Sequence, residues 1–391
     1  MSERNYYCSN KFRFLKLDLE RQLSYTCHAA YPQNIDFSWL TNNTGELFNI
    51  PINIEERQQM LDNVRTASCE QNCWPAEDQG KTSVRMLENT LDRTHTDLYV
   101  KPEILDLTID SDCNLSCVYC CKEFSSSWRR EIERTGPYTF PVSDSKLVDR
   151  YHLDKKDIIL SALSQQQRQS SKRYQQLLQE VDLMLPTLKK LFVSGGEPFL
   201  STQLIDILTK AKDVPYIKLF TGLGISPARL EKVLQSLPRL DNLEVTISGE
   251  GIGEYYEFAR YGNTYQKFLD NIAVLEKHNI KFKFHSTISN LTLHGFLEFY
   301  NAYRLHDFEI DFAYTPGFLS PNVIDPVSKQ ELSEKLLQCN TDITTMIVKS
   351  MQPEFDNTQR QNLAAMLDQI KQRRTVNLNI FPKHFLDWIY S

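Results

Sequence analysis

Apolar and polar residues follow two different spacings along this 391-residue chain. Short alternating or apolar stretches predict β-strands, and longer stretches with apolar residues three and four positions apart predict amphipathic helices. The strands predicted in the central part of the chain are residues 103–110, 190–194, 217–221, 242–248, 281–289 and 308–314. Helices are predicted between them, and strands that alternate with helices form parallel sheets with right-handed crossovers. The pattern therefore predicts an α/β fold, an incomplete (β/α)6 barrel of the TIM type.

The segments around this barrel have patterns of their own. Residues 12–18 and 22–27 alternate like the strands of a hairpin, residues 35–48 are loop-rich, and residues 54–66 have helical spacing. Residues 142–188 enlarge the first connection, where we expect one or two crossover helices, with a lid or partner-binding insert as the alternative. The tail is predicted to cover the open barrel edge, with helices at residues 326–338, 341–351 and 357–373 and a short, aromatic-rich closing segment at residues 381–390. An N-terminal module, the barrel and a C-terminal extension are expected at residues 1–98, 99–317 and 318–391.

Composition and charge narrow the class of protein. Apolar residues make up 41% of the chain, which is enough for a large core. The net charge of −6 gives no footprint for nucleic acid, and basic residues do not gather into a membrane anchor. We find no apolar run of about 18 residues and no signal-peptide core, so a soluble, cytoplasmic protein is expected. Nine cysteines in a cytosolic chain favour metal binding over disulfides.

Three cysteines follow the first predicted barrel strand with the spacing C-x3-C-x2-C. They are Cys113, Cys117 and Cys120, and Cys121 is a spare thiol beside them. Three thiolates on one short loop can hold three corners of a cubane iron–sulfur cluster, which leaves the fourth iron open to a small molecule. An open coordination position suggests catalysis. By themselves, however, three close cysteines are also compatible with a zinc knuckle or with buried thiols.

A second motif, Ser-Gly-Gly-Glu-Pro at residues 194–198, follows the second predicted barrel strand. Two glycines let the backbone approach a ligand closely, and Glu197 offers a carboxylate to an ammonium group. With both motifs present, residues 103–317 resemble the radical S-adenosylmethionine (SAM) enzymes. The resemblance implies the partial barrel of that family, a [4Fe-4S] cluster, and SAM bound to the open iron through its amino and carboxylate groups.

The resemblance also assigns roles to single residues. Cys113, Cys117 and Cys120 match the cluster ligands of the family, and Tyr119 matches the aromatic position near the adenine. The motif that meets the SAM amino group is matched by Gly195, Gly196, Glu197 and Pro198. The serines at 125–127 are expected to cover the cluster or to donate hydrogen bonds to its sulfides, which would tune its potential.

Ligands of such folds bind at the C-terminal ends of the strands. That rule predicts one mouth lined by Cys113, Glu197, Thr221, Ser248, Ser286 and Tyr314. By resemblance, Ser248 would meet the SAM hydroxyls, with a backbone-capping serine as the alternative. Arg260 would reach the SAM carboxylate or the substrate, because a guanidinium suits a bidentate carboxylate; a surface ion pair is the alternative. Thr221 and His285 are weaker candidates for the pocket lining, and core packing suits His285 equally well.

Four more cysteines, Cys8, Cys27, Cys69 and Cys73, precede the barrel on a predicted hairpin and a C-x3-C loop. Four thiolates suffice for one closed iron–sulfur cluster or one zinc ion. The arrangement resembles the twitch and SPASM auxiliary-cluster modules of radical SAM enzymes, although those usually follow the core. We therefore expect a second, auxiliary [4Fe-4S] cluster, with structural zinc or unligated cysteines as alternatives. If Cys8 lies too far away, an open iron could bind substrate.

The resemblance implies reductive cleavage of SAM to a 5′-deoxyadenosyl radical, which abstracts hydrogen from a substrate. An external one-electron reductant of the flavodoxin or ferredoxin type would supply the electron. A peptide is the first expectation for the substrate, by analogy with other proteins that carry such modules. A nucleotide or nucleobase, a cofactor precursor and a carbohydrate are alternatives. A non-catalytic iron–sulfur or zinc scaffold, and methyl transfer through Cys121 or Cys339, fit the motifs less well.

Overall fold

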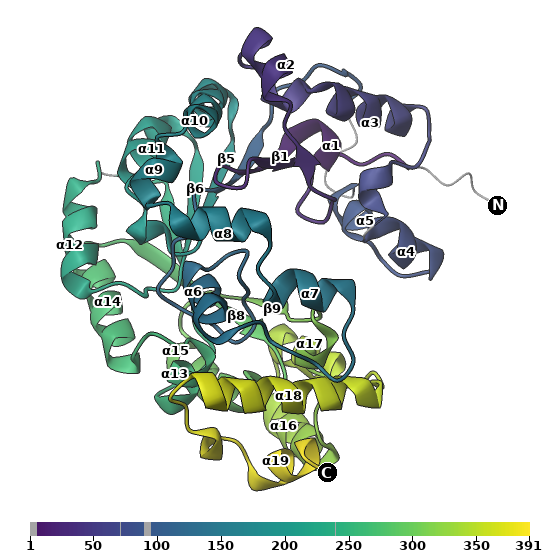
Figure 1. Ribbon diagram of the computed structural model, residues 1–391, viewed down its shortest axis with the longest axis vertical. Coiled ribbons are helices and arrows are strands. Elements are labelled where there is room, and N and C mark those ends of the chain that lie inside the picture. The colour runs from purple at the N-terminus through teal and green to yellow at the C-terminus, as the bar shows by residue number, and fades with distance from the viewer. Residues whose placement is uncertain (1–5, 71, 90–94, 239) are drawn as a thin grey trace. The chain divides into compact units, whose positions relative to one another are not determined.

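The computed structural model describes residues 6–70, 72–89, 95–238 and 240–391 (Figure 1). The chain has an α/β fold whose strands are mostly parallel, which confirms the predicted fold class. Its residues gather into two compact units. Unit 1 comprises residues 1–110, 164–219 and 236–243. Unit 2 comprises residues 111–163, 220–235 and 244–391. The described helices include none that is long and apolar enough to cross a membrane.

Unit 1 contains the first half of the predicted barrel strands. These strands are β4 (Ile104–Thr108), β5 (Lys190–Ser194) and β6 (Tyr216–Thr221), and each pairs in parallel with the next. Their inward residues are apolar and fully buried, such as Leu105, Leu191 and Ile217. The crossover from β4 to β5 ends in helix α10, and α11 follows β5, at Lys172–Met184 and Leu204–Lys210.

The N-terminal hairpin belongs to the same sheet. Strand β1 (Phe14–Asp18) pairs antiparallel with β2 (Leu23–Tyr25), as predicted. It also pairs in parallel with β4, with Phe14 opposite Ile104. Sequence reasoning did not foresee this second pairing, because an alternating pattern does not say which strand lies beside it. The hairpin is therefore joined to β4 by backbone hydrogen bonds, and the predicted boundary at residue 98 does not separate the two units.

The other helices of the N-terminal module correct several boundaries. Residues 35–48 hold helix α2 (Phe37–Asn42), whose N-terminus is capped by Asp36, so the prediction of a loop there is wrong in part. Helix α3 (Pro51–Leu61) begins three residues early, because proline favours the first turn. The short helices α1, α4 and α5 span Asn10–Arg13, Cys73–Asp78 and Val84–Asn89. Residues 1–5, 71 and 90–94 of the predicted module lie outside the described residues.

Unit 2 holds the second half of the barrel strands. Strands β7 (Leu243–Ser248), β8 (Lys281–Ile288) and β9 (Phe308–Phe312) are parallel neighbours, with Ser248 opposite His285. Helices follow β7 and β8 as predicted. They are α13, α14 and α15, at Glu254–Ala259, Tyr265–Lys277 and Leu293–Tyr303.

The C-terminal residues form a helical group in unit 2, as predicted (Figure 1, yellow and light green). The helices are α16, α17, α18 and α19, at Pro326–Gln338, Asp342–Ser350, Asn357–Arg373 and Lys383–Ile389. Their apolar faces share one core with Trp128, Tyr151 and Phe296. Cys339 directly follows α16 and is half-buried.

The enlarged first connection contains four helices instead of the one or two predicted. They are α7, α8, α9 and α10, beginning at Ser145, Lys155, Gln165 and Lys172. Each begins after a residue whose side chain accepts hydrogen bonds from the first turn, namely Asp144, Asp154, Ser164 and Ser171. Such N-caps start new helices, so the apolar spacing that suggested one long helix is divided into short ones.

Candidate active site

The three motif cysteines are brought together on the loop after β4. Cys113 and Cys117 are both 8% exposed and form a small buried cluster, against which Cys120 and Tyr119 pack. Burial raises the pKa of the Cys117 thiol, and burial together with the neighbouring cysteines raises the pKa of Cys120 further. Buried thiols that resist ionisation lose their protons most readily to a bound cation.

The backbone of this cysteine loop is held by the segment after α13. Ser116 N donates to Tyr261 O at 2.8 Å, and Val118 N donates to Ala259 O at 3.0 Å. Gly262 lies against the same loop with φ of +107°, where a Cβ atom would stand 2.4 Å from Asn114 O. Only glycine allows both this backbone conformation and this close approach. The loop is therefore positioned by main-chain contacts that the cysteine motif does not specify.

The serine run after the cysteines supports the same loop. Ser126 Oγ accepts from Cys113 N and donates to Cys113 O, both at 3.0 Å, and Ser127 Oγ donates to that carbonyl as well. Ser125 Oγ donates to Leu115 O at 2.6 Å and caps α6 (Ser126–Thr135). These hydroxyls bind main-chain groups. Hydrogen bonds from them to cluster sulfides therefore stay a prediction.

A buried polar network lies beside Cys117. Arg260 donates to both carboxylate oxygens of Glu250, through Nε and Nη2, at 2.8 Å each. Its Nη1 atom is 3.7 Å from Cys117 Sγ, and Tyr119 donates from its hydroxyl to Glu250 at 2.7 Å. All of this is enclosed, because the side chains of Glu250 and Arg260 are 0% and 5% exposed. The alternative of a surface ion pair for Arg260 is therefore wrong, and its contact with SAM stays a prediction.

Sequence reasoning missed Glu250, the acidic centre of this network. The available signal was its position two residues after the end of β7, ten positions before Arg260, with only the short helix α13 between them. A pair that is bidentate and buried positions both side chains strongly, because each would be costly to leave alone. Arg260 thus joins the site as a neighbour of the Cys117 sulfur.

Sequence reasoning also missed Arg374, which lies just after α18. Its Nη1 atom donates to Ser116 O in the cysteine loop at 2.8 Å, and its Nε atom donates to Glu131 at 2.8 Å. The guanidinium lies over the Trp128 ring, 4.4 Å from its centre. The C-terminal extension therefore contributes a buried cation that fixes the loop.

The Gly-Gly-Glu motif follows β5 in unit 1. Gly196 N donates to Asp110 O at 2.8 Å, and a Cβ atom on Gly195 would lie 2.7 Å from that carbonyl oxygen. Glu197 is fully buried, and its carboxylate accepts from Phe199 N at the start of the 3-10 turn Pro198–Leu200. Residue 195 must therefore be glycine, because the carbonyl of residue 110, just before the cysteine loop, leaves no room for a side chain.

The remaining predicted residues lie at or near strand ends. Thr221 ends β6 and accepts from Leu223 N at 2.9 Å, and Ser248 ends β7 and is half-buried. Ser286 is buried within β8 and donates to Gly249 O. Tyr314 follows β9 and is 56% exposed. His285 is half-buried and lies 3.0 Å from the exposed carboxylate of Asp311, and its place in the pocket lining stays a prediction. The common mouth, which joins residues of both units, stays a prediction.

The four N-terminal cysteines are also brought together. Cys8, Cys69 and Cys73 belong to one buried cluster with Met60 and Trp74. Burial raises the pKa of Cys8 to about 12, and the neighbouring Cys27 and Cys69 thiols contribute to this shift. Cys73 donates to Cys69, which favours the thiolate at Cys69 and lowers its pKa. Cys8 is therefore not too distant from the other three.

These two groups of cysteines are neighbouring thiols without a preformed coordination shell. Among the residues that the structure describes, no set of three or more His, Cys, Asp or Glu side chains is arranged to hold a metal ion. Their donor type nevertheless suits iron–sulfur clusters, which take thiolate ligands. Their service as ligands stays a prediction.

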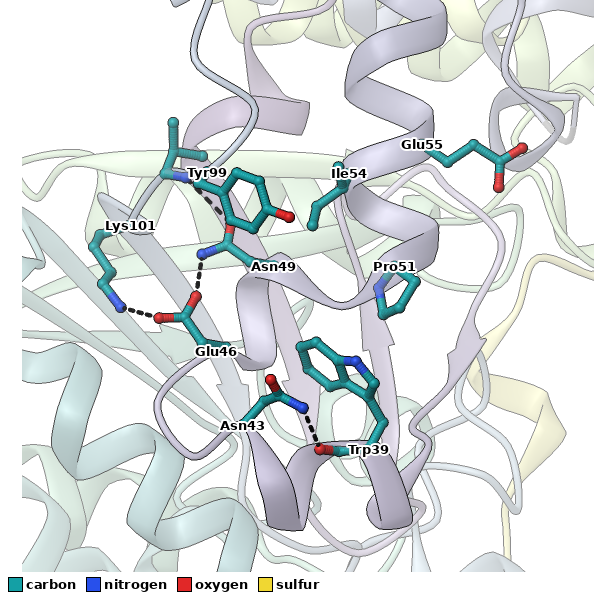
Figure 2. Close-up of a pocket in the computed structure, with 10 residues that line it drawn as sticks. Trp39, Asn43, Glu46, Asn49, Pro51, Ile54, Glu55, Tyr99 and Lys101 are labelled. Carbon is teal, nitrogen blue, oxygen red and sulfur yellow. Dashed lines mark hydrogen bonds and ion pairs between the residues drawn. The ribbon is translucent and has the colours of Figure 1, made fainter.

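A separate cavity of about 820 Å³ lies in unit 1, on the side of α3 opposite its buried face (Figure 2). Trp39, Pro51, Ile54 and Tyr99 give it an apolar lining. At its polar end, Glu46 accepts from Asn49 at 2.7 Å and from Lys101 at 3.2 Å. Sequence reasoning did not predict this cavity, because its lining comes from two segments about fifty residues apart.

Comparisons with known proteins agree with the cysteine motif. Residues 109–302 match the family described as the Radical SAM superfamily. A GTP 3′,8-cyclase from Lactiplantibacillus plantarum is 29% identical over 197 residues, which are 50% of this chain and 46% of that protein. The chain thus aligns with about half the length of this curated relative.

Two solved structures align with this chain. Native anSMEcpe with bound AdoMet is 16% identical, with 54% of this chain and 51% of that chain covered and a TM-score of 0.32. Streptococcus suis SuiB bound to precursor peptide SuiA is 10% identical, with 98% and 88% covered and a TM-score of 0.36.

Proposed function

We propose that this chain is a radical SAM enzyme that abstracts hydrogen from a substrate, because residues 109–302 match the Radical SAM superfamily. The observation that carries the proposal is the buried group of Cys113, Cys117 and Cys120 on the loop after β4. Bound there, a [4Fe-4S] cluster and SAM would supply reductive cleavage of SAM and a carbon-centred radical. The radical SAM match confirms the fold resemblance of the core.

The chain's own residues would hold the cluster, orient the loop that carries its ligands, and shield it from water. Three thiolates would bind three irons, and the backbone of residues 259–262 with Arg374 fixes the loop that carries them. Arg260 donates toward Cys117 Sγ, which would stabilise negative charge on that ligand. Leu115 and Val118 are 2% and 0% exposed, so the loop brings apolar cover that excludes water.

The SAM site is proposed on the Gly-Gly-Glu motif and the strand ends. Gly195 lets the Asp110 carbonyl approach its backbone closely, and the buried Glu197 carboxylate suits an ammonium group. Tyr119, Thr221, Ser248 and Pro198 complete the set by resemblance. Arg260 is already bidentate to Glu250, so we assign it first to the Cys117 sulfur and second to a SAM carboxylate.

The N-terminal cysteines are proposed to hold an auxiliary [4Fe-4S] cluster, as in twitch and SPASM modules. Cys8 interacts with each of the other three thiols and Cys69 interacts with Cys27 and Cys73, which supports a closed centre with four protein ligands. A closed centre has no open iron for substrate, so its role is structural or electronic. Structural zinc on the same four thiols is the alternative.

The most detailed part of the proposal is the chemical class of the substrate. We keep a peptide as the first candidate, by analogy with other proteins that carry auxiliary modules. A nucleotide is the second candidate, and the observation that favours it is the 29% identity to a GTP 3′,8-cyclase. The electron would come from an external flavodoxin- or ferredoxin-type reductant.

The test is iron and sulfide content after anaerobic reconstitution, with SAM cleavage under dithionite measured on the same samples. We expect about eight irons per wild-type chain, and about four after Cys113, Cys117 and Cys120 are all changed to alanine. Cleavage should disappear in that variant. Cys121→Ala is the matched control, since it removes the adjacent thiol and should keep both iron and cleavage.

Two results would contradict parts of the proposal. Wild-type protein that holds iron on the motif cysteines yet never yields 5′-deoxyadenosine, with peptide or nucleotide substrates present, would contradict the enzymatic function. About four irons in wild type that fall to none in the triple variant would contradict the auxiliary cluster and leave the radical SAM cluster standing.

A further inference from the structure

A lysine ammonium is buried in the centre of the N-terminal cysteine module. Lys11 lies on α1 and is 1% exposed. Its Nζ atom makes three contacts of 2.6 Å, to Thr26 Oγ1, Glu56 Oε2 and Ser68 Oγ. An ammonium has three protons to donate, so its hydrogen-bonding capacity is filled. A fully enclosed lysine is rare in proteins unless it is paired, and here one carboxylate pairs it.

The partners of Lys11 place it among the cysteines. Thr26 directly precedes Cys27, Ser68 directly precedes Cys69, and Lys11 itself follows Cys8 by three residues. One ammonium therefore connects the three segments that carry three of the four cysteines. The fourth, Cys73, is coupled to Cys69 through the hydrogen bond between their thiols.

The Lys11 charge acts on the sulfurs as well as on the backbone around them. It favours the thiolate form of Cys8, Cys27 and Cys69, and it lowers the pKa of each relative to burial alone. Glu56 acts in the opposite direction on Cys69. Both charged side chains are at most 5% exposed, so water and salt screen them little.

The other buried cations nearby are engaged elsewhere. Arg85 is bidentate to Glu77, with Nε at 2.9 Å and Nη2 at 2.5 Å. Arg57 donates to three main-chain carbonyls and to Asn49. Lys11 and Glu56 are thus the pair of opposite charges through which the module can set the field at its sulfurs.

We infer that Lys11 is a positioning residue that raises the reduction potential of the metal centre on Cys8, Cys27, Cys69 and Cys73, and that Glu56 offsets part of this effect. The inference rests on the proposed auxiliary [4Fe-4S] cluster. Reduction adds one electron from the external one-electron reductant and transfers no proton. A fixed positive charge stabilises the more negative, reduced state, as net charge does in iron–sulfur proteins generally.

The experiment is a potentiometric titration followed by electron paramagnetic resonance. The Cys113, Cys117 and Cys120 to alanine variant of the full chain serves as background, so that only the N-terminal centre is observed. Lys11→Met should shift the midpoint potential to more negative values, and Glu56→Gln should shift it to more positive values. Lys101→Met is the matched control, because it removes the same charge from an exposed lysine and should leave the midpoint unchanged.

A second variant keeps the test valid if Lys11→Met fails to fold with Glu56 buried and unpaired. Lys11→Met/Glu56→Gln leaves no unpaired charge, and its midpoint should be more negative than that of Glu56→Gln. Shifts of one sign in both single variants, or no shift in either, would overturn the role of Lys11. A background protein without iron would instead overturn the auxiliary cluster itself, and the inference with it.

Discussion

The buried pair of Arg374 and Glu131 makes the sharpest stability prediction. Their side chains are 0% and 6% exposed and are joined at 2.8 Å, and Arg374 also donates to Ser116 O. Arg374→Met removes the cation and keeps a long apolar side chain over Trp128. Removing one partner of such a pair leaves an uncompensated buried carboxylate, which costs about 3–5 kcal/mol. We expect that loss in the free energy of unfolding of the apoprotein.

The assay is urea unfolding followed by tryptophan fluorescence. The double variant Arg374→Met/Glu131→Gln should recover part of the loss, because no charge is then left unpaired. Lys371→Met, an exposed lysine three residues earlier, is the control and should change stability by about 0.5 kcal/mol or less. Iron on the motif cysteines should fall in Arg374→Met more than in the double variant. A single variant as stable as the control, or losses that simply add, would refute the reasoning.

Two further predictions concern unit 2. Gly262→Ala should destabilise the cysteine loop by more than about 1 kcal/mol and reduce its iron content, since a Cβ atom would collide with the Asn114 carbonyl. Gly136→Ala has similar backbone strain at φ of +84° but no neighbouring atom, so a larger loss there would contradict the explanation. Burial lowers the pKa of His294 to about 4, so the unfolded chain takes up its proton first as the pH falls below about 6.5. Stability should drop by about 3 kcal/mol between pH 6.5 and 4, and His294→Phe should remove that slope while His306→Phe, an exposed control, should keep it.

Most elements of the fold followed from local patterns. The six barrel strands lie within a residue or two of their predicted bounds, because alternation and apolar runs reflect burial of one or both sheet faces. Predictions failed where capping residues took precedence over apolar spacing, as in the division of residues 142–188 into four helices. The pairing of β1 with β4 was not predictable, since strand order depends on contacts between distant segments.

The candidate site, like the fold, was predictable only in part. The chemistry of the site could be predicted from the spacing of its residues, because C-x3-C-x2-C and Gly-Gly-Glu-Pro are each short and contiguous. The residues that hold the cysteines could not be predicted, since Arg374 lies 258 positions from Ser116. The sequence around Glu250 gave only a weak indication of its role, and nothing in the sequence distinguished Lys11 from other lysines. Burial is what gives these charges their role, and burial is a property of the whole fold.

The sequence by itself determined which atoms can do chemistry in this protein: three thiols on one loop, two more on a C-x3-C loop, and a Gly-Gly-Glu turn after a strand. Spacing within one loop fixes such groups, because a few residues of chain cannot carry them far apart. The tertiary structure alone decided that Cys8 joins Cys27, Cys69 and Cys73, and that Arg260, Arg374 and Lys11 lie beside sulfur or its loops. These outcomes depend on long-range packing, which removes charges from water and thereby makes their interactions strong.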